Sequence, residues 1–160
     1  MGILHRLSGF IWMTAIMVIC GNPVFSQVLP PAPVHPVPTA QQLAWHRMEM
    51  NAFIHFSINT FTDQEWGYGN EPAAAFNPAD ADPNQWARVL SDNHFKGIIL
   101  TAKHHDGFCL WPDQNTDHSI KNSPYKDGKG DLVRETADAA GEFGMKFGIY
   151  ISPWDRNRAD

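Results

Sequence analysis

Two adjacent histidines follow an apolar segment in the middle of the sequence. The stretch KGIILTAKHHDGFCLWP, residues 96–112, begins like a buried strand and continues into His104 and His105. His55 follows another apolar run in the same way. Imidazole nitrogens offer both hydrogen-bond donors and acceptors. Histidines gathered in one place would therefore suit a ligand that carries hydroxyl groups.

The ends of the predicted strands decide whether these histidines can meet. Neighbouring residues of a regular strand point to opposite faces, so His104 and His105 can share a site only if the strand ends there. The Asp106-Gly107 pair that follows is a turn signal. Tyr150 lies near the end of a third apolar run. Because the carboxyl ends of parallel strands converge on one rim, we expect the histidines and the tyrosine to meet there.

Acidic and aromatic residues accompany the histidines along the chain. Glu65 and Trp66 lie in the segment after the first predicted strand, whereas Trp111 and Trp154 follow the second and third. Tryptophan rings offer flat faces for the apolar C–H patches of a sugar. Histidine, carboxylate and tryptophan together therefore predict a sugar-binding pocket.

Two other readings of the same residues stay open. His55, one of the paired histidines and Asp106 could hold a single metal ion, although adjacent histidines chelate one ion poorly. Alternatively, the histidines are satisfied core or loop residues, and Tyr150 is a core side chain. Asp155 and Arg156 are expected to form an ion pair that orders the rim.

Three apolar runs are predicted as the strands that position these residues: MNAFIHFSI, GIILTA and KFGIYISPW. A helix should begin after each intervening loop, with Asp82 and Asp131 as N-caps and Pro83 at the first helical position. Thr39 is the N-cap candidate of a further helix ahead of the first strand. Continuous apolar strands that alternate with helices predict a parallel βαβαβ sheet.

Each of the two main helices is predicted to bury one apolar face. The first face comprises Trp86, Val89, Leu90 and Phe95, and the second comprises Leu132, Val133, Thr136, Ala140 and Phe143. Long loops over 59–81 and 111–130 follow the carboxyl ends of the first two strands, where (β/α)8 barrels keep their active sites. The predicted fold class is therefore α/β, with the first three strands and two helices of a (β/α)8 TIM barrel.

The remaining features concern the whole chain and its ends. The 160 residues carry a formal net charge of -5 with no basic stripe, which argues against nucleic acid as a partner.

Residues 1–26 are predicted as a signal peptide cleaved after Ser26, so the protein should be secreted or periplasmic, with no membrane span after cleavage. Residues 27–38 form a Pro-rich linker, and residues 39–160 the N-terminal part of a catalytic barrel. Cys109 is expected in the core.

At these residues the sequence resembles the family 29 glycoside hydrolases, the α-L-fucosidases, from about Pro38 to Asp160. The segments that carry the resemblance are FIHFSINTFTDQEWGYG, FNPADADPNQW, KGIILTAKHHDGFCLWP, HSIKNSPYKDGKGDLV and KFGIYISPWDRN. Their number and order make the resemblance specific. Ser57 departs from it, since many members have glycine there, and the small side chain should matter little.

The resemblance implies a metal-free, cofactor-free glycosidase that releases terminal α-L-fucose from a fucosylated glycan or glycoconjugate, with retention of configuration. It implies fucose-binding roles for His55, Glu65, Trp66, His104, His105 and Tyr150. Retaining chemistry needs two carboxylates, a nucleophile and an acid/base, and the family places both beyond residue 160. Asp106 and Asp155 do not match those positions, so no catalytic residue is expected in this chain. The alternatives are an inactive or non-catalytic sugar-binding fragment and a metal-dependent hydrolase on a TIM barrel.

Overall fold

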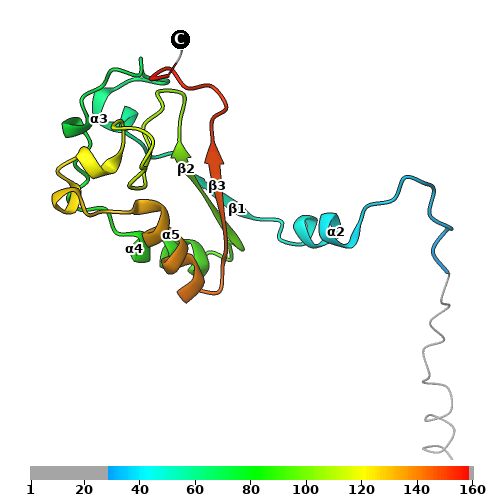
Figure 1. Cartoon of the computed structure of the whole chain (residues 1–160). Helices are drawn as coiled ribbons and strands as arrows, with labels where there is room; N and C mark the ends of the chain where they lie inside the picture. Colours follow the sequence, from blue (N-terminus) through cyan, green and yellow to red (C-terminus); the bar gives the residue numbers. More distant parts are fainter. Residues whose placement is uncertain (1–28, 159–160) are drawn as a thin grey trace, which may run out of the picture. The chain divides into compact units, whose positions relative to one another are not determined.

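A three-stranded parallel sheet forms the centre of the fold (Figure 1). The computed structural model describes residues 29–158, with the strands β1 (Asn51–Ile54), β2 (Gly97–Lys103) and β3 (Lys146–Ile151) in the order β1-β2-β3. In the register, Gly97 of β2 pairs with Asn51 of β1 and Lys146 of β3. The predicted parallel βαβαβ order is confirmed. Residues 29–37 belong to a separate unit from the one that begins at Pro38.

The helices begin where their capping residues predict. The Asp82 side chain accepts a hydrogen bond from Gln85 N at the start of α4 (Pro83–Asp92), at 3.0 Å. Asp131 does the same for Arg134 N, at 2.9 Å, at the start of α5 (Leu132–Glu142). These bonds satisfy backbone donors that have no partner within the helix. A third helix, α2 (Ala40–His46), starts with a capping box between Thr39 and Gln42, and its side chains are exposed.

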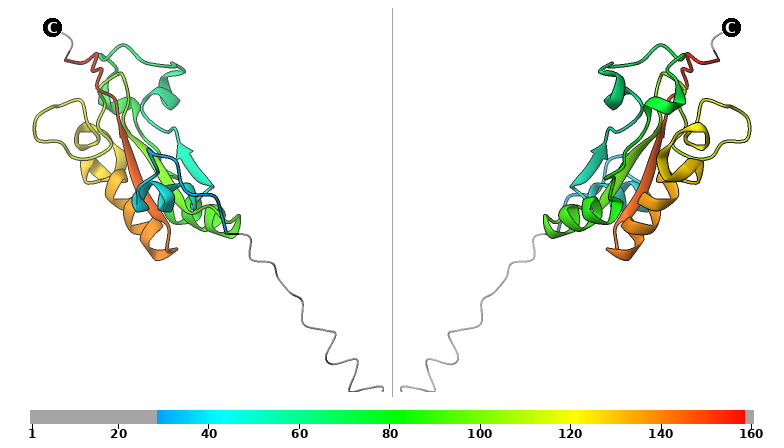
Figure 2. Two further views of the ribbon diagram at one scale, coloured as in Figure 1. Left: turned by 90° about the vertical axis from the view of Figure 1, so that its right-hand side faces the viewer. Right: turned by 90° about the vertical axis from the view of Figure 1, so that its left-hand side faces the viewer.

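Both main helices cover the same face of the sheet (Figure 2). Ile98 of β2 packs in a buried cluster with Ala87 of α4 and Ala140 of α5. On the opposite face Phe53 is 50% exposed, and its ring lies 5.8 Å from that of Tyr150. The sheet therefore has one covered face and, within the described residues, one apolar face that is open to solvent.

Two side chains that were predicted to be buried are partly exposed. Val89 of α4 is 45% exposed and Phe143, which caps the end of α5, is 36% exposed. Both side chains therefore lie on parts of the helix surface that the other described elements leave uncovered. Cys109 is confirmed as a core residue, and burial raises the pKa of its thiol to about 12, which keeps it protonated.

The predicted long loops contain short helical segments. The segment between β1 and α4 includes α3 (Asn59–Thr62) and the 3-10 turn η1 (Ala73–Ala75). The segment between β2 and α5 includes η2 (Ile120–Asn122) and η3 (Tyr125–Gly128). These two segments share an aromatic core of Phe76, Phe108 and Tyr125. They are therefore packed parts of the domain, placed above the carboxyl ends of the strands.

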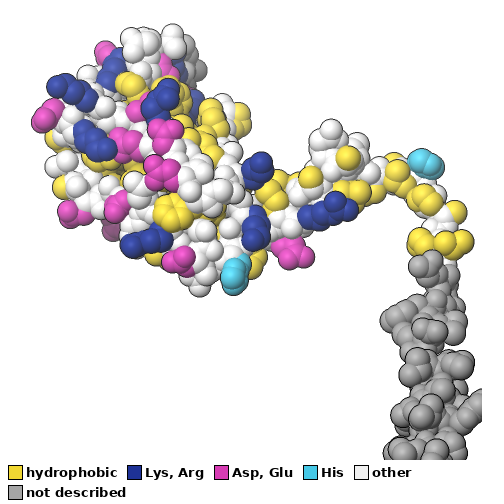
Figure 3. Space-filling view, turned by 90° about the horizontal axis from the view of Figure 1, so that it is seen from below, with side chains coloured by type: hydrophobic (Ala, Val, Ile, Leu, Met, Phe, Trp, Pro, Cys, Tyr) yellow, Lys and Arg dark blue, Asp and Glu magenta, His cyan; other side chains and the backbone are white. Residues whose placement is uncertain are grey.

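The surface charges agree with the scattered pattern of the sequence. On the face shown in Figure 3, Lys and Arg side chains lie among Asp and Glu side chains over the compact unit. Neither sign gathers into one large patch on that face.

In the part of the chain that the structure describes, none of the helices has the length and apolar character needed to cross a bilayer.

Candidate functional site

The three predicted histidines lie together at the carboxyl ends of β1 and β2. The ring centroids of His55 and His104 are 4.8 Å apart, and those of His104 and His105 are 4.4 Å apart. Tyr150 from β3 approaches the same group, with its ring 6.0 Å from that of His104. The expectation that strand ends would bring these side chains together is therefore confirmed.

The end of β2 explains how two successive histidines reach one site. The pairing of β2 with β3 shifts register between Thr101 and Lys103, and the strand ends before the histidine pair. Gly107 then adopts a φ of +88°, and its N–H donates to the carbonyl of His104 at 3.1 Å. Glycine tolerates this left-handed conformation without steric cost. The predicted turn is thus present and breaks the strand alternation at the point required.

Two of the three predicted tryptophans flank His105. The ring of Trp66 lies 5.6 Å from His105, that of Trp154 lies 5.3 Å from it, and the two indoles are 5.9 Å apart. Trp111 lies elsewhere, beside Cys109 in a separate hollow, so its predicted place in the pocket is wrong. Glu65 is exposed, and its carboxylate makes no hydrogen bond or ion pair with other residues in the range 29–158.

We call these side chains the histidine–tryptophan cluster. Its members are His55, Trp66, His104, His105, Tyr150 and Trp154. The cluster combines imidazole nitrogens with partly exposed indole faces, and it joins residues from all three strand ends. This arrangement is suited to a ligand that has both hydroxyl groups and apolar patches.

The segment after β3 ties the loops of the cluster together. The predicted ion pair between Asp155 and Arg156 is wrong, because Asp155 Oδ2 pairs with Lys103 Nζ at 2.9 Å. The Arg156 guanidinium instead lies 4.4 Å from the Trp154 ring centroid and donates to the carbonyl of Gly67. Its planar shape allows stacking and hydrogen bonding at once, which a lysine would not reproduce.

Two further hydrogen bonds extend the same connection. Arg156 N donates to the carbonyl of His105 at 2.9 Å, and Asn157 Nδ2 donates to that of Gly69 at 2.7 Å. We call residues 155–157 the strap. It links the turn that carries the paired histidines to the loop that carries Trp66, so the spacing of the cluster depends on it.

A buried carboxylate lies beneath the paired histidines. Asp106 is 0% exposed, and it accepts hydrogen bonds from Asn59 Nδ2 at 2.8 Å and from Phe108 N at 2.7 Å. Burial raises the pKa of its carboxyl, and the bond from the Phe108 N–H opposes that rise. One oxygen therefore ties the turn to helix α3, and the other closes the turn through Phe108 N.

A second buried pair supports the loop that carries Trp66. Glu71 accepts hydrogen bonds from Gly69 N at 2.9 Å and from Tyr68 N, so it closes this loop upon itself. His118 Nε2 lies 3.9 Å from both Glu71 Oε2 and Asp106 Oδ1. Burial lowers the pKa of His118, and the two carboxylates oppose that change.

Among the described residues, no group of three or more His, Cys, Asp or Glu side chains is arranged to hold a metal ion.

The electrostatics of the cluster favour a neutral imidazole at His104. Burial lowers the pKa of His104 to about 4, and the neighbouring His105 and His55 contribute in the same direction. Desolvation disfavours the charged ring, and a second positive charge a few ångströms away would be repelled. His104 is therefore neutral at pH 7, with one nitrogen as donor and the other as acceptor.

This pKa predicts a specific loss of stability in acid. The folded-state pKa of His104, about 4, lies below the unfolded value of 6.5. Between these values the unfolded chain binds a proton that the folded chain does not, so stability falls as pH decreases from 6.5 towards 4. Urea unfolding should show that the free energy of unfolding falls between pH 7 and pH 4.5 in both proteins. The fall should be about 2 kcal/mol larger in the wild type than in His104→Asn. An equal loss in both proteins would contradict the prediction.

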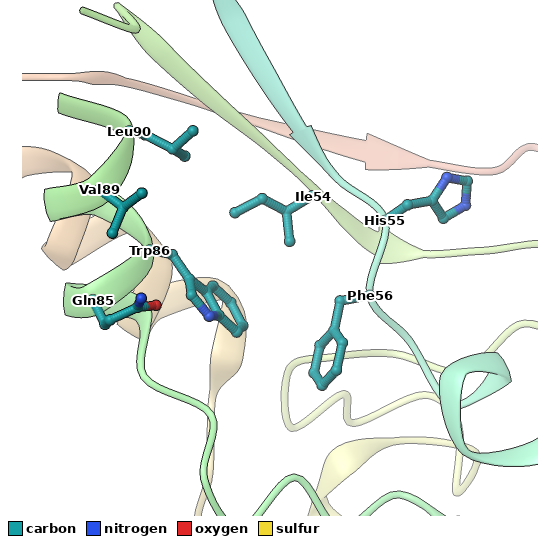
Figure 4. A pocket seen from close by; sticks show the side chains of 7 residues that line it. All are labelled: Ile54, His55, Phe56, Gln85, Trp86, Val89 and Leu90. Atoms are coloured by element: carbon teal, nitrogen blue, oxygen red, sulfur yellow. The ribbon is translucent and has the colours of Figure 1, made fainter. Parts of the chain in front are cut away.

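An apolar groove lies beside the cluster but is separate from it (Figure 4). Its walls are Ile54 at the end of β1 and Trp86, Val89 and Leu90 of α4, which point toward one another. His55 borders the groove, and its ring points away from these side chains (Figure 4). The groove lies along the free edge of β1, whereas the polar groups gather on the other side of that strand end.

Several residues that shape the site carry no signal in the sequence. Arg156, Glu71 and His118 act through partners many positions away, and only contact between distant segments shows their roles. Ser152 is another, since its hydroxyl lies 2.6 Å from His105 Nδ1. Its place immediately after β3, opposite the histidine pair, is the one feature that could have singled it out.

Comparisons with known proteins agree with this architecture. The sequence model of the family described as Alpha-L-fucosidase matches residues 33–160. Alpha-L-fucosidase 1 of Arabidopsis thaliana is 50% identical over 127 residues, which cover 79% of this chain and 25% of the plant protein. The crystal structure of a glycoside hydrolase 29 family member from an unknown rumen bacterium has 61% identity and a TM-score of 0.76, and the match covers 79% of this chain and 23% of that one.

A further solved structure contains a sugar. It is a Ruminococcus gnavus GH29 fucosidase in complex with fucose, with 38% identity and a TM-score of 0.72, and the match covers 81% of this chain and 27% of that one. The chain thus spans about a quarter of the length of the relatives it matches. On the family match and these similarities, the chain belongs to the α-L-fucosidases of glycoside hydrolase family 29.

Proposed function

We propose that this chain forms part of a retaining exo-α-L-fucosidase, which releases terminal α-L-fucose from glycans or glycoconjugates by double displacement. One observation carries the proposal: in a chain of this family, side chains that the sequence predicts to bind fucose converge in the histidine–tryptophan cluster. The fucose complex of the Ruminococcus gnavus relative supports the choice of sugar.

The cluster has chemical groups that suit a deoxyhexose. Neutral imidazoles such as His104 can accept a hydrogen bond from one sugar hydroxyl and donate to another. The indoles of Trp66 and Trp154 provide surfaces for the methyl group and the C–H bonds of the ring. Glu65, which is exposed beside Trp66, would accept from a further hydroxyl. Holding the sugar in one orientation lowers the barrier by reducing the entropy lost at the transition state.

The catalytic carboxylates of this mechanism are proposed to come from another part of the protein. Retaining hydrolysis needs a nucleophile and an acid/base about 5 Å apart. Asp106 is buried under two hydrogen bonds, and Asp155 is paired with Lys103, so neither is free to act as nucleophile. We therefore assign substrate binding, and no catalytic role, to the residues of this chain.

We also propose that the sheet continues into a (β/α)8 barrel. Within the described chain, β1 and β3 each pair with β2 alone, so both are edge strands. Ile149 and Ile151 of β3 are each 49% exposed, and the apolar groove runs along the edge of β1. Exposed apolar edges of this kind are normally covered by further structure. A barrel would cover both edges and enclose Phe53 and Tyr150 in its interior.

Secretion remains a proposal from the sequence. The predicted signal peptide, residues 1–26, lies outside the described residues, as does the start of the predicted linker at residue 27. A secreted or periplasmic location would give the enzyme access to extracellular glycans. Mass spectrometry of the mature protein would show whether the chain begins at Gln27.

The proposed activity can be tested with the complete gene product. It should hydrolyse an aryl α-L-fucoside, with fucose as a competitive inhibitor, and should not hydrolyse the matching aryl β-D-galactoside. The 160-residue chain alone should show no turnover, because the catalytic pair would be missing. Activity should survive a chelator; its loss would favour the metal-dependent hydrolase. Absence of fucosidase activity in the folded complete protein would refute the proposal.

A further inference from the structure

We infer that Ser152 holds His105 in a single tautomer, with the proton on Nδ1, and so presents Nε2 as a hydrogen-bond acceptor toward a sugar hydroxyl. The identity of the ligand rests on the proposed function. The tautomer follows from the contacts of the serine hydroxyl alone. Ser152 is therefore proposed as a positioning residue, which acts on the ligand through His105.

The serine hydroxyl has three close polar neighbours. Ser152 Oγ lies 2.6 Å from His105 Nδ1 and 2.7 Å from the carbonyl oxygen of Trp154, and it accepts from Trp154 N at 3.1 Å. Ser152 is only 1% exposed, so these contacts are made in a nearly dry environment. Its backbone N–H donates to the carbonyl of Lys103 at 2.9 Å, which fixes the serine against the end of β2.

Counting protons assigns each of these contacts a direction. A hydroxyl has one hydrogen to donate and two lone pairs that accept. The carbonyl of Trp154 has no hydrogen, so its 2.7 Å contact with Ser152 Oγ must use the serine proton. The Trp154 N–H occupies one lone pair. The remaining contact, at 2.6 Å, is then satisfied only if His105 Nδ1 carries a hydrogen and donates it to the hydroxyl.

The consequence for binding concerns the other ring nitrogen. In a neutral imidazole with a proton on Nδ1, Nε2 holds a lone pair and can only accept. No hydrogen bond within residues 29–158 uses His105 Nε2. The ring also packs against the indoles of both Trp66 and Trp154, which limits its rotation. A hydroxyl can donate to this nitrogen, whereas a carbonyl or carboxylate at the same place would face a lone pair and be rejected.

The chain offers a matched control for this serine. Ser123 is also buried and also precedes a proline, and its hydroxyl makes the same kind of local pair, donating to Ile120 O at 2.7 Å and accepting from Tyr125 N at 3.3 Å. Neither of these hydrogen bonds involves a histidine. Ser123→Ala therefore removes an equivalent turn hydroxyl without changing the partner of His105.

The experiment uses the complete protein labelled with ¹⁵N-histidine. Long-range ¹H–¹⁵N spectra distinguish a protonated from an unprotonated ring nitrogen, and the His105 signals are assigned by their loss in His105→Gln. We expect the wild type, Ser123→Ala and Ser152→Thr to show the proton on Nδ1. Ser152→Ala should show a mixture of tautomers and bind fucose roughly tenfold more weakly, whereas Ser123→Ala binds like the wild type.

Each outcome decides a separate question. A wild-type His105 with its proton on Nε2 would overturn the inference, even if Ser152→Ala failed to fold. Unchanged tautomer and unchanged fucose affinity in folded Ser152→Ala would also overturn it. If the tautomer is as expected but wild-type protein does not bind fucose, the proposed function fails while the role of Ser152 stands.

Discussion

Replacing Asp106 with leucine is expected to lower the free energy of unfolding by about 4 kcal/mol, because it removes the acceptor of two buried donors. The carboxylate is fully buried and accepts from Asn59 Nδ2 and Phe108 N. Leaving a buried donor without a partner costs about 1–3 kcal/mol each. Leucine relieves the burial of a charge, but it cannot satisfy either N–H group. Urea unfolding at pH 7 measures the change.

The matching variant Asp106→Asn separates the hydrogen bonds from the charge. Asn59 Oδ1 is buried and has no partner in the described structure, so rotation of that amide would place an acceptor opposite the new NH₂ group. The asparagine oxygen could still accept from Phe108 N. We therefore expect a loss of about 1 kcal/mol or less. A similar large loss in both variants would mean that the negative charge, and not the pair of acceptors, holds the turn.

A second control uses the same exchange at a surface carboxylate. Asp82 accepts a single bond from Gln85 N at the start of α4. Asp82→Leu should cost about 1 kcal/mol, which is typical for the loss of an N-cap. If Asp106→Leu cost no more than Asp82→Leu, the buried network beneath the histidines would have no special importance for stability.

The main elements could be predicted because each is determined by neighbouring residues. Asp82 and Asp131 lie immediately before the helices that they cap, and the apolar runs before His55 and His104 form strands. The parallel order then places the strand ends on one rim. The convergence of the histidines therefore follows from local pattern and topology alone.

The partners of the strap could not be predicted, since they depend on close approach of distant segments. Asp155 and Arg156 are adjacent, which suggests an ion pair, but their side chains diverge toward Lys103 and Trp154. Trp111 likewise follows β2 closely in sequence, yet its segment folds toward Cys109 and away from the cluster. Sequence proximity gives no direction for a side chain once the regular strand has ended.

The close approach of the strap to the loop of Trp66 depends on Gly69, so Gly69→Ala is expected to weaken fucose binding by roughly a hundredfold. A Cβ at this position would lie 2.5 Å from Arg156 C and from Asn157 N, and the strap is held there by the bond from Arg156 N to the carbonyl of His105. The loop would have to move away from the strap, which would shift Trp66 relative to His105. Loss of several contacts of about 1 kcal/mol each gives this magnitude. Calorimetric titration with fucose measures it.

The chain contains a glycine that separates this clash from backbone strain. Gly69 has a φ of +87° and Gly144 has a φ of +66°, so alanine in either position adopts a left-handed conformation that costs about 1–2 kcal/mol. Around Gly144 nothing lies within 4 Å of the new Cβ. Gly144→Ala should therefore lose stability but keep its affinity for fucose. Since both variants carry the same kind of backbone strain, an equal loss of affinity would show that strain alone weakens the site, and the strap would then have no role in positioning Trp66.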